Sequence, residues 1–189
     1  TVAGQYYEES RDVRKLKNLE SKVQREQVYI GQFNLEASKK LGTHSKLVYG
    51  AEYIQNNLTS TAWKYHELVP DNTWPAQTRY ADGSLWQSTS GYAMLHSDLS
   101  DRLSASGGIR LNGVKLFTPI SFNGFVQDTY LQFLAPSAEL GLTYFRQTFK
   151  YFLNLSTGFR APNIDDASKV FDSQPGALII PNPDLHEER

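Results

Sequence analysis

The residues that could do chemistry are scattered, and none of their groupings matches a catalytic pattern. Asp165 and Asp166 could serve as an acid and a base, but adjacent side chains in an extended chain point in opposite directions. His96 and Asp98 would share one strand face, yet two ligands are too few for a metal site. With no cysteine, the chain has no thiol nucleophile and no disulfide. Nucleophile-elbow, phosphate-loop and zinc-protease motifs are also missing. We therefore predict no catalytic residue, no metal site and no cofactor.

A second set of polar residues follows a strand-like segment at residues 151–157. Pro162 fixes its own φ and restricts the residue before it, so no strand can run through this point. Further prolines and a Pro-Gly pair at 175–176 predict irregular structure as far as Leu185. Charged and amide side chains could hold such a segment in place, with ion pairs preferred to direct ligand contact. The predicted anchors are Arg160, Asp165, Asp166 and Asn182.

Tryptophans supply the remaining candidates for ligand binding. Trp74 and Trp86 fall in residues 57–89, a polar segment for which we expect a long loop. Structureless segments of this length are uncommon in compact domains, and they are usually functional or disordered. Either tryptophan could contact a ligand or pack within the loop, and these alternatives are equally supported. We add Arg160 as a third candidate ligand contact.

The composition favours strands and excludes several classes of partner. Among 189 residues, 13% are aromatic and 21% are charged, and the net charge is −1. Aromatic residues are enriched in strands, whereas a nucleic-acid-binding protein would show a basic surface. No run approaches the ~18 apolar residues that predict a transmembrane helix. Strands of a membrane barrel remain compatible with these values, because they show only alternation.

Alternation of apolar and polar residues is the clearest pattern in the chain. In residues 103–112 the odd positions are mostly apolar and the even positions are small or polar. This period of two indicates a strand that is covered on one side. Similar patterns occur elsewhere and predict about seven antiparallel strands, which are residues 2–8, 27–37, 46–55, 91–99, 103–112, 138–144 and 151–157.

The predicted connections alternate between short and long. Short turns are expected at residues 38–45, 100–102 and 147–149, and long loops at residues 9–24, 57–89, 112–136 and 159–185. In an up-and-down meander this puts every short turn at one rim, as in outer-membrane barrels. The polar strand faces would then line a hydrated lumen. An odd number of about seven strands does not close a bacterial barrel. We therefore predict an all-β fold, an antiparallel up-and-down meander that forms an arc of a larger transmembrane β-barrel.

Two short motifs resemble a known family. Phe-Arg-Ala-Pro at 159–162 and Asn-Pro-Asp-Leu at 182–185, with Asn-Ile-Asp-Asp-Ala-Ser-Lys-Val-Phe-Asp-Ser at 163–173 between them, resemble paired boxes of TonB-dependent outer-membrane receptors. The resemblance implies a plugged barrel in the outer membrane of a Gram-negative bacterium, in contact with its lipid. It also implies energised import of a scarce, small chelate such as an iron-siderophore, haem or cobalamin.

The resemblance also sets expectations about partners and cargo. The plug domain and the TonB energy-coupling protein would both lie outside this chain. Residues 1–189 would be part of the barrel domain, without the plug and the C-terminal strands. Haem importers that resemble the chain at both boxes typically carry a histidine between them, whereas residues 163–181 contain none and the nearest is His186. This departure favours a siderophore or another chelate over haem.

Two alternatives remain from the residues themselves. The first is a soluble antiparallel barrel or sandwich that acts as a binding module, with its polar strand faces in solvent. The second, with less support, is a β-sheet hydrolase. The position of the apolar faces separates the receptor from the soluble module. A soluble module would bury Leu103, Ile109, Leu140 and Leu142 in a closed core.

Overall fold

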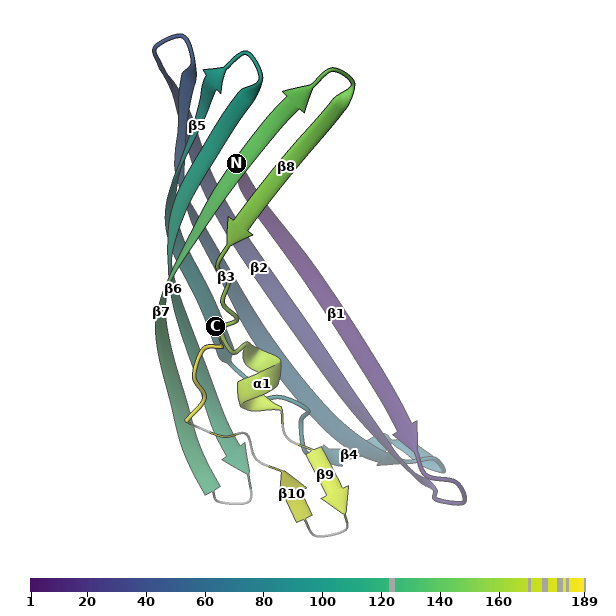
Figure 1. Cartoon of the computed structure of the whole chain (residues 1–189). Helices are drawn as coiled ribbons and strands as arrows, with labels where there is room; N and C mark the ends of the chain where they lie inside the picture. Colours follow the sequence, from purple (N-terminus) through teal and green to yellow (C-terminus); the bar gives the residue numbers. More distant parts are fainter. Residues whose placement is uncertain (123–124, 170, 175–176, 180–181, 183, 189) are drawn as a thin grey trace.

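The computed structural model describes residues 1–122, 125–169, 171–174, 177–179, 182 and 184–188. One antiparallel sheet dominates it (Figure 1). Its strands are β1 (Val2–Arg14), β2 (Glu20–Leu41), β3 (Ser45–His66), β4 (Val69–Pro75), β5 (Ser84–Ser100), β6 (Leu103–Phe122), β7 (Phe125–Arg146) and β8 (Phe149–Ser156). The strand order is β1-β2-β3-β5-β6-β7-β8, with β4 paired to β3 alone. The predicted up-and-down meander is therefore confirmed.

The sheet curves into an open half-barrel with two different rims (Figure 1). The three short turns, between β2 and β3, β5 and β6, and β7 and β8, lie together at one end, which we call the turn rim. The β1–β2 and β6–β7 hairpins and β4 lie at the opposite end, the hairpin rim. The predicted gathering of short turns at one rim is confirmed.

Alternation assigns the side chains to a convex outer face and a concave inner face. On the outer face Ile109 is 69% exposed and Leu140 is 63% exposed, as are many apolar neighbours. A soluble domain that left so much contiguous apolar surface in water would aggregate. These residues do not form a closed core in the described chain, which is the arrangement expected of a barrel wall that faces lipid.

The expected long loops are mostly strands, and this prediction was wrong for three of the four segments. Residues 9–24 contain the end of β1 and the start of β2, residues 57–89 contain parts of β3 and β5 and all of β4, and residues 112–136 lie largely in β6 and β7. The strands continue past the apolar band, where outer-face positions become polar. The apolar-out pattern is lost there because outer positions become polar and inner positions of β6 and β7 become apolar, while the backbone ladder continues.

Pro136 illustrates why a proline was misleading in this sequence. It lies inside β7 and pairs with Leu111 of β6. The amide of Ala138, two residues on, points to the opposite edge of β7, where it donates to Thr157 Oγ1. Pro136 has its nitrogen on that same edge, beyond the residues that pair with β8. Its missing N–H therefore removes no ladder hydrogen bond, as is usual for proline at a strand edge.

After β8 the chain turns to the concave side. Helix α1 (Ile164–Ser168) lies there, followed by a small hairpin of β9 (Phe171–Gln174) and β10 (Ala177–Ile179) (Figure 1). Strand β8 ends before Pro162, as expected, but the following segment is more regular than predicted. Asn163 starts α1 because its side chain accepts from the amide of Asp166, while the Asp166 carboxylate accepts from the Asn163 amide. This reciprocal capping box stabilises a helix too short to persist alone.

Candidate functional site

The inner face carries a polar network at mid-height of the sheet. Arg110 of β6 pairs with Glu52 of β3 and donates to Ser90 Oγ of β5 at 2.6 Å and to Asn112 Oδ1 at 2.7 Å. Asn34 of β2 donates to Glu52 Oε1 at 3.2 Å. Four strands thus place complementary side chains at neighbouring register positions. Arg110 and Glu52 are partly exposed, at 36% and 23%, and together these groups give a polar wall to the half-barrel.

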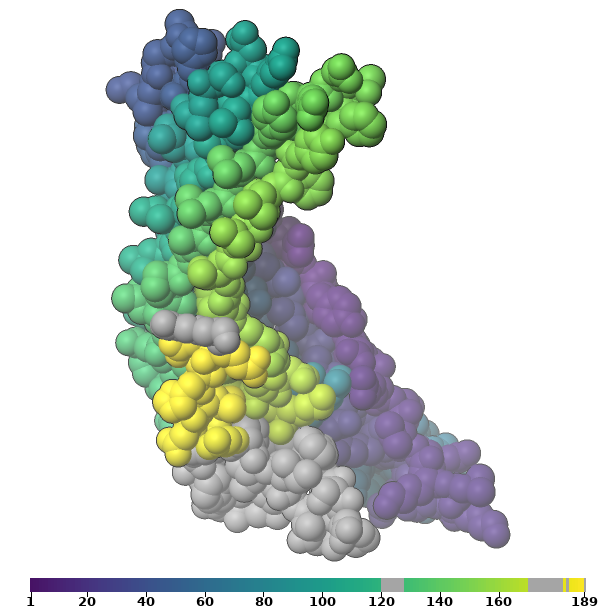
Figure 2. All heavy atoms as spheres, viewed as in Figure 1, coloured from purple at the N-terminus to yellow at the C-terminus, as the bar shows by residue number. Residues whose placement is uncertain are grey.

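Towards the hairpin rim the inner face becomes apolar, and α1 packs on it. The cluster at this contact consists of Val114, Leu116, Leu131, Phe133 and Ala167, all less than 10% exposed. Trp86 and Phe159 pack against it from β5 and from the segment after β8. The alternation of β6 explains the contact, since Leu116 and Thr118 follow Arg110 and Asn112 on the same face. Figure 2 shows this C-terminal part of the chain filling part of the concavity between β1 and β7.

An ion pair between Arg160 and Asp166 connects the segment after β8 to α1. Arg160 Nη2 donates to both carboxylate oxygens of Asp166, at 3.0 and 3.1 Å, so one nitrogen is shared between two acceptors. Arg160 also forms an isolated β-bridge with Glu188 through two backbone hydrogen bonds of 2.9 Å. The bridge thereby joins the first box segment, at Arg160, to Glu188, which lies three residues beyond the second box.

Asp165 points away from Arg160 and reaches a different part of the chain. It accepts from the Tyr80 hydroxyl at 2.6 Å and from Lys169 Nζ at 3.3 Å. These hydrogen bonds, chiefly the one from Tyr80, hold the pKa of the Asp165 carboxyl below its ordinary value of 3.8. Burial and the neighbouring carboxylate raise the pKa of Tyr80. The segment between β4 and β5 is thus tied to α1 by a contact between residues far apart in sequence.

Replacing Tyr80 by phenylalanine is expected to raise the pKa of Asp165 towards its ordinary value. A carboxyl whose pKa is lowered by folding contributes stability above its ordinary pKa of 3.8 and loses it as the pH falls through the lowered value. Removing the hydroxyl shrinks that contribution, which at this exposed site is below about 1 kcal/mol. A ¹³C NMR titration of the Asp165 carboxyl in the receptor that contains this chain measures the shift.

Lys169→Met is the comparison variant for this titration, because Lys169 is the weaker partner of Asp165. It should raise the pKa of Asp165 less than Tyr80→Phe does. An unchanged titration curve in Tyr80→Phe would show that the hydroxyl is not the main partner of this carboxylate.

A further charged cluster lies on the inner face beside the segment between β4 and β5. Arg79 extends to Glu9 of β1 at 3.6 Å, and Arg11 contacts the same carboxylate at 2.7 Å. Glu26 of β2 stands opposite Glu9, is 3% exposed and has no hydrogen-bond partner within the described residues. No sequence signal marked Glu26, because only the sheet register and the covering segment bury it.

The three predicted ligand contacts lie on different elements. Trp74 belongs to β4 and pairs with Lys64 of β3, so it is not in a loop as expected. Trp86 belongs to β5 and packs beside α1, and Arg160 stands at the entry to α1. Asn182 accepts from the backbone amide of Asp184 at 3.0 Å, which is a local turn contact. Their assignment to ligand binding and to anchoring stays a prediction.

The comparisons with known proteins decide the class. Residues 3–189 match the family described as TonB dependent receptor-like, beta-barrel. The chain belongs to the TonB-dependent receptor β-barrel family. A search of the curated proteins gives no match. A solved structure described as "Copper transporter OprC" is similar in fold, with a TM-score of 0.69 and 14% sequence identity over 87% of this chain. This chain spans only 27% of that protein.

Family membership confirms several of the expectations drawn from the sequence. The half-barrel is an arc of a TonB-dependent receptor barrel, and such barrels reside in the outer membrane of Gram-negative bacteria. The family consists of receptors and transporters, so the hydrolase alternative is wrong, and the exposed apolar outer face argues against the soluble module. Among the described residues, no helix has the length and apolarity to cross a membrane. The same residues contain no cluster of three or more potential metal-binding His, Asp or Glu side chains.

Proposed function

We propose that this chain forms part of the wall of an outer-membrane receptor that imports a scarce ligand with energy delivered through TonB. Residues 1–189 would be one partial barrel domain. The plug and the TonB protein are partners of the whole receptor, and lipid contacts the outer face. The observation that carries the proposal is the division of the sheet into an exposed apolar outer face and a polar inner face, in a chain that belongs to this family.

The inner face supports a role in passing a polar ligand. Arg110, Glu52 and Ser90 present charges and hydroxyls at mid-height, where a hydrated passage requires them. At the hairpin rim, α1 narrows the concavity and brings Trp86 beside the segment that carries Arg160. Aromatic and cationic groups together suit an anionic or aromatic chelate. This combination favours ligand contact at Trp86 and Arg160, with Trp74 further along the rim.

The cargo we propose is a metal chelate, with an iron-siderophore as the first candidate. The missing histidine between the two boxes disfavours haem. The solved structure with a similar fold is named a copper transporter, which keeps copper within the range of metals to test. The anchoring role that we propose for Arg160, Asp165, Asp166 and Asn182 would hold the ligand-facing rim in one shape.

Uptake in cells tests this function. A strain that lacks the receptor is expected to lose accumulation of one radiolabelled metal chelate from a panel of iron-siderophores, haem, cobalamin and copper. The gene restores uptake only when TonB is intact, since energy coupling is part of the proposal. Uptake that persists without TonB would contradict it, and so would recovery of the protein in the soluble fraction. Wild-type growth on ferric citrate at high concentration serves as the control for viability.

A further inference from the structure

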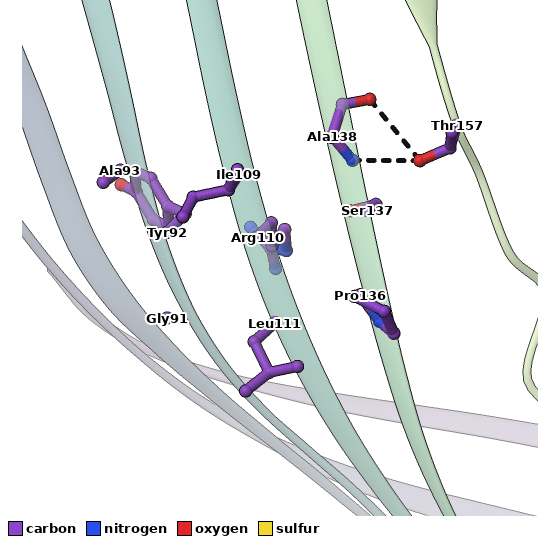
Figure 3. A pocket seen from close by; sticks show the side chains of 10 residues that line it. All are labelled: Gly91, Tyr92, Ala93, Ile109, Arg110, Leu111, Pro136, Ser137, Ala138 and Thr157. Atoms are coloured by element: carbon purple, nitrogen blue, oxygen red, sulfur yellow. Dashed lines mark hydrogen bonds between the residues drawn. The ribbon is translucent and has the colours of Figure 1, made fainter.

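The outer face of β5, β6 and β7 is indented by two recesses that follow each other along the strands. The first has a volume of about 640 Å³ (Figure 3). The outer-face residues that line it are Gly91, Ala93, Ile109, Leu111, Pro136 and Ala138. The second has a volume of about 560 Å³ and is more polar. The outer-face residues that line it are Tyr53, Gln87, Thr89, Gly113, Lys115, Gln132 and Leu134.

The sheet register makes the two recesses neighbours. Gly91, Leu111 and Pro136 form one cross-strand row. The next outer-face row towards the hairpin rim contains Thr89, Gly113 and Leu134, about 7 Å away along the strands. The first row belongs to the apolar recess and the second to the polar one. The two recesses therefore follow each other directly along the strands, and together they form what we call the depression, which changes from apolar to polar.

This change coincides with the edge of the apolar band. Ile109 and Leu111 are 69% and 50% exposed beside the first recess, and in Figure 3 they lie one after the other along β6. Beyond Leu134, the outer-face position on β7 is Gln132, and the position opposite it on β6 is Lys115. The depression thus spans from the hydrocarbon region to the headgroup level on the side of the hairpin rim, which is the extracellular side in barrels of this kind.

The polar end of the depression carries one cationic group, Lys115, that suits a phosphate. Lys115 is exposed and has no ion pair within the described part of the chain. Gln87 is held by hydrogen bonds from its amide nitrogen to Tyr53 Oη at 3.0 Å and to Gln55 Oε1 at 2.9 Å. These two hydrogen bonds use both N–H donors of the Gln87 amide and hold it beside Lys115, so the group that can bind a phosphate at this end is the Lys115 ammonium. The volume of each recess falls within the ~300–1,000 Å³ of small-ligand sites.

We propose that this depression binds one phosphorylated, acylated lipid of the outer leaflet. An acyl chain lies along Ile109 and Leu111, and the headgroup phosphate lies on Lys115. The occupant follows from continuity with the lipid-facing band and from the charge of Lys115, which complements phosphate at the headgroup level. The inference rests on the membrane position in the proposed function, but not on transport.

Native mass spectrometry of the detergent-purified receptor tests the site with diphosphoryl lipid A as the probe. Lys115→Gln is expected to weaken binding about fivefold, as for one lysine near an anionic headgroup. Gly91→Leu is expected to abolish it by filling the apolar recess, since a Cβ at Gly91 meets nothing closer than the Gly50 oxygen at 3.9 Å. The matched controls are Lys39→Gln, an outer-face lysine at the turn rim, and Gly31→Leu, where a Cβ meets nothing within 4 Å.

Each outcome of this experiment has a defined meaning. Reduced binding in both test variants, with both controls unchanged, supports the site. Equal binding by all four variants would overturn it. Equal binding of dephosphorylated lipid A would overturn the role of phosphate, and full competition by inorganic phosphate would indicate a free-anion site in place of a lipid site. Because binding is measured in detergent, a receptor that fails in the uptake assay can still pass this test.

Discussion

Replacing Gly50 with alanine is expected to destabilise the barrel by about 1–3 kcal/mol, the usual cost of overpacking. A Cβ at this position would lie 2.5 Å from the Leu35 carbonyl oxygen and 2.6 Å from the Tyr92 hydroxyl. Tyr92 crosses β3 above Gly50 and donates to Glu36 Oε2 on β2 at 2.9 Å. The methyl group would displace the ring and also press on a backbone atom that cannot rotate away. Urea unfolding of the receptor in phosphatidylcholine vesicles measures the loss.

Gly31→Ala is the matched control for this substitution. Gly31 lies opposite Gln55 on the neighbouring strand, faces outward, and a Cβ there meets nothing within 4 Å. Its unfolding curve should match that of the parent. A double variant with Tyr92→Ala separates the two contacts, because it frees the space of the ring but leaves the Leu35 oxygen. Equal stability of Gly50→Ala and Gly31→Ala would show that the close approach at Gly50 is not a constraint.

Replacing Asp166 with alanine is expected to loosen α1 by about 1–2 kcal/mol. The substitution removes the hydrogen bond from the Asn163 amide to the carboxylate, and capping contacts of this kind contribute about 1 kcal/mol. It also removes the ion pair with Arg160, which adds less than about 1 kcal/mol because the Arg160 side chain is 59% exposed. Amide hydrogen exchange across Ile164–Ser168 in the whole receptor should accelerate about tenfold.

Two companion variants show which contact matters. Asp166→Asn keeps an oxygen that can accept from the Asn163 amide but loses the charge, so it should cause the smaller change. Glu188→Gln alters the other ion pair of Arg160, which is longer at 3.4 Å and involves a 71% exposed side chain. We expect little effect from it. Parent-like exchange in Asp166→Ala would refute the proposed anchoring role of this residue.

Much of the barrel wall could be predicted because period-two alternation is a local property. Ile109, Leu111 and Arg110 already occupied opposite faces in the sequence pattern, and the structure keeps them there. The short connections were predicted for the same reason, since a tight turn depends on a few adjacent residues such as Gly42, whose φ is +78°. The side on which each strand faces lipid was therefore encoded within each strand.

The candidate site was only partly predictable. The sequence located Arg160, Asp165 and Asp166 at the point where the chain leaves the sheet. It did not show which residue each of them contacts. In the structure, Arg160 donates a hydrogen bond to Asp166, and the Tyr80 hydroxyl donates one to Asp165. Tyr80 lay in a segment without periodicity, and no local rule links it to a residue so distant in the chain. Helix α1 was also not predicted, because prolines near its capping box indicated irregular structure.

By itself the sequence determined the meander, its two faces and its turn rim, since these follow from neighbouring residues and from the pleat of a strand. Tertiary structure alone decided how far the strands extend, because stretches of β3 and β6 that lack an apolar-out pattern are held in the ladder by their partner strands. Tertiary structure also decided that α1 packs on the inner face and that the Tyr92 side chain lies over Gly50. These depend on register between strands, which places distant residues side by side and leaves no mark in either segment alone.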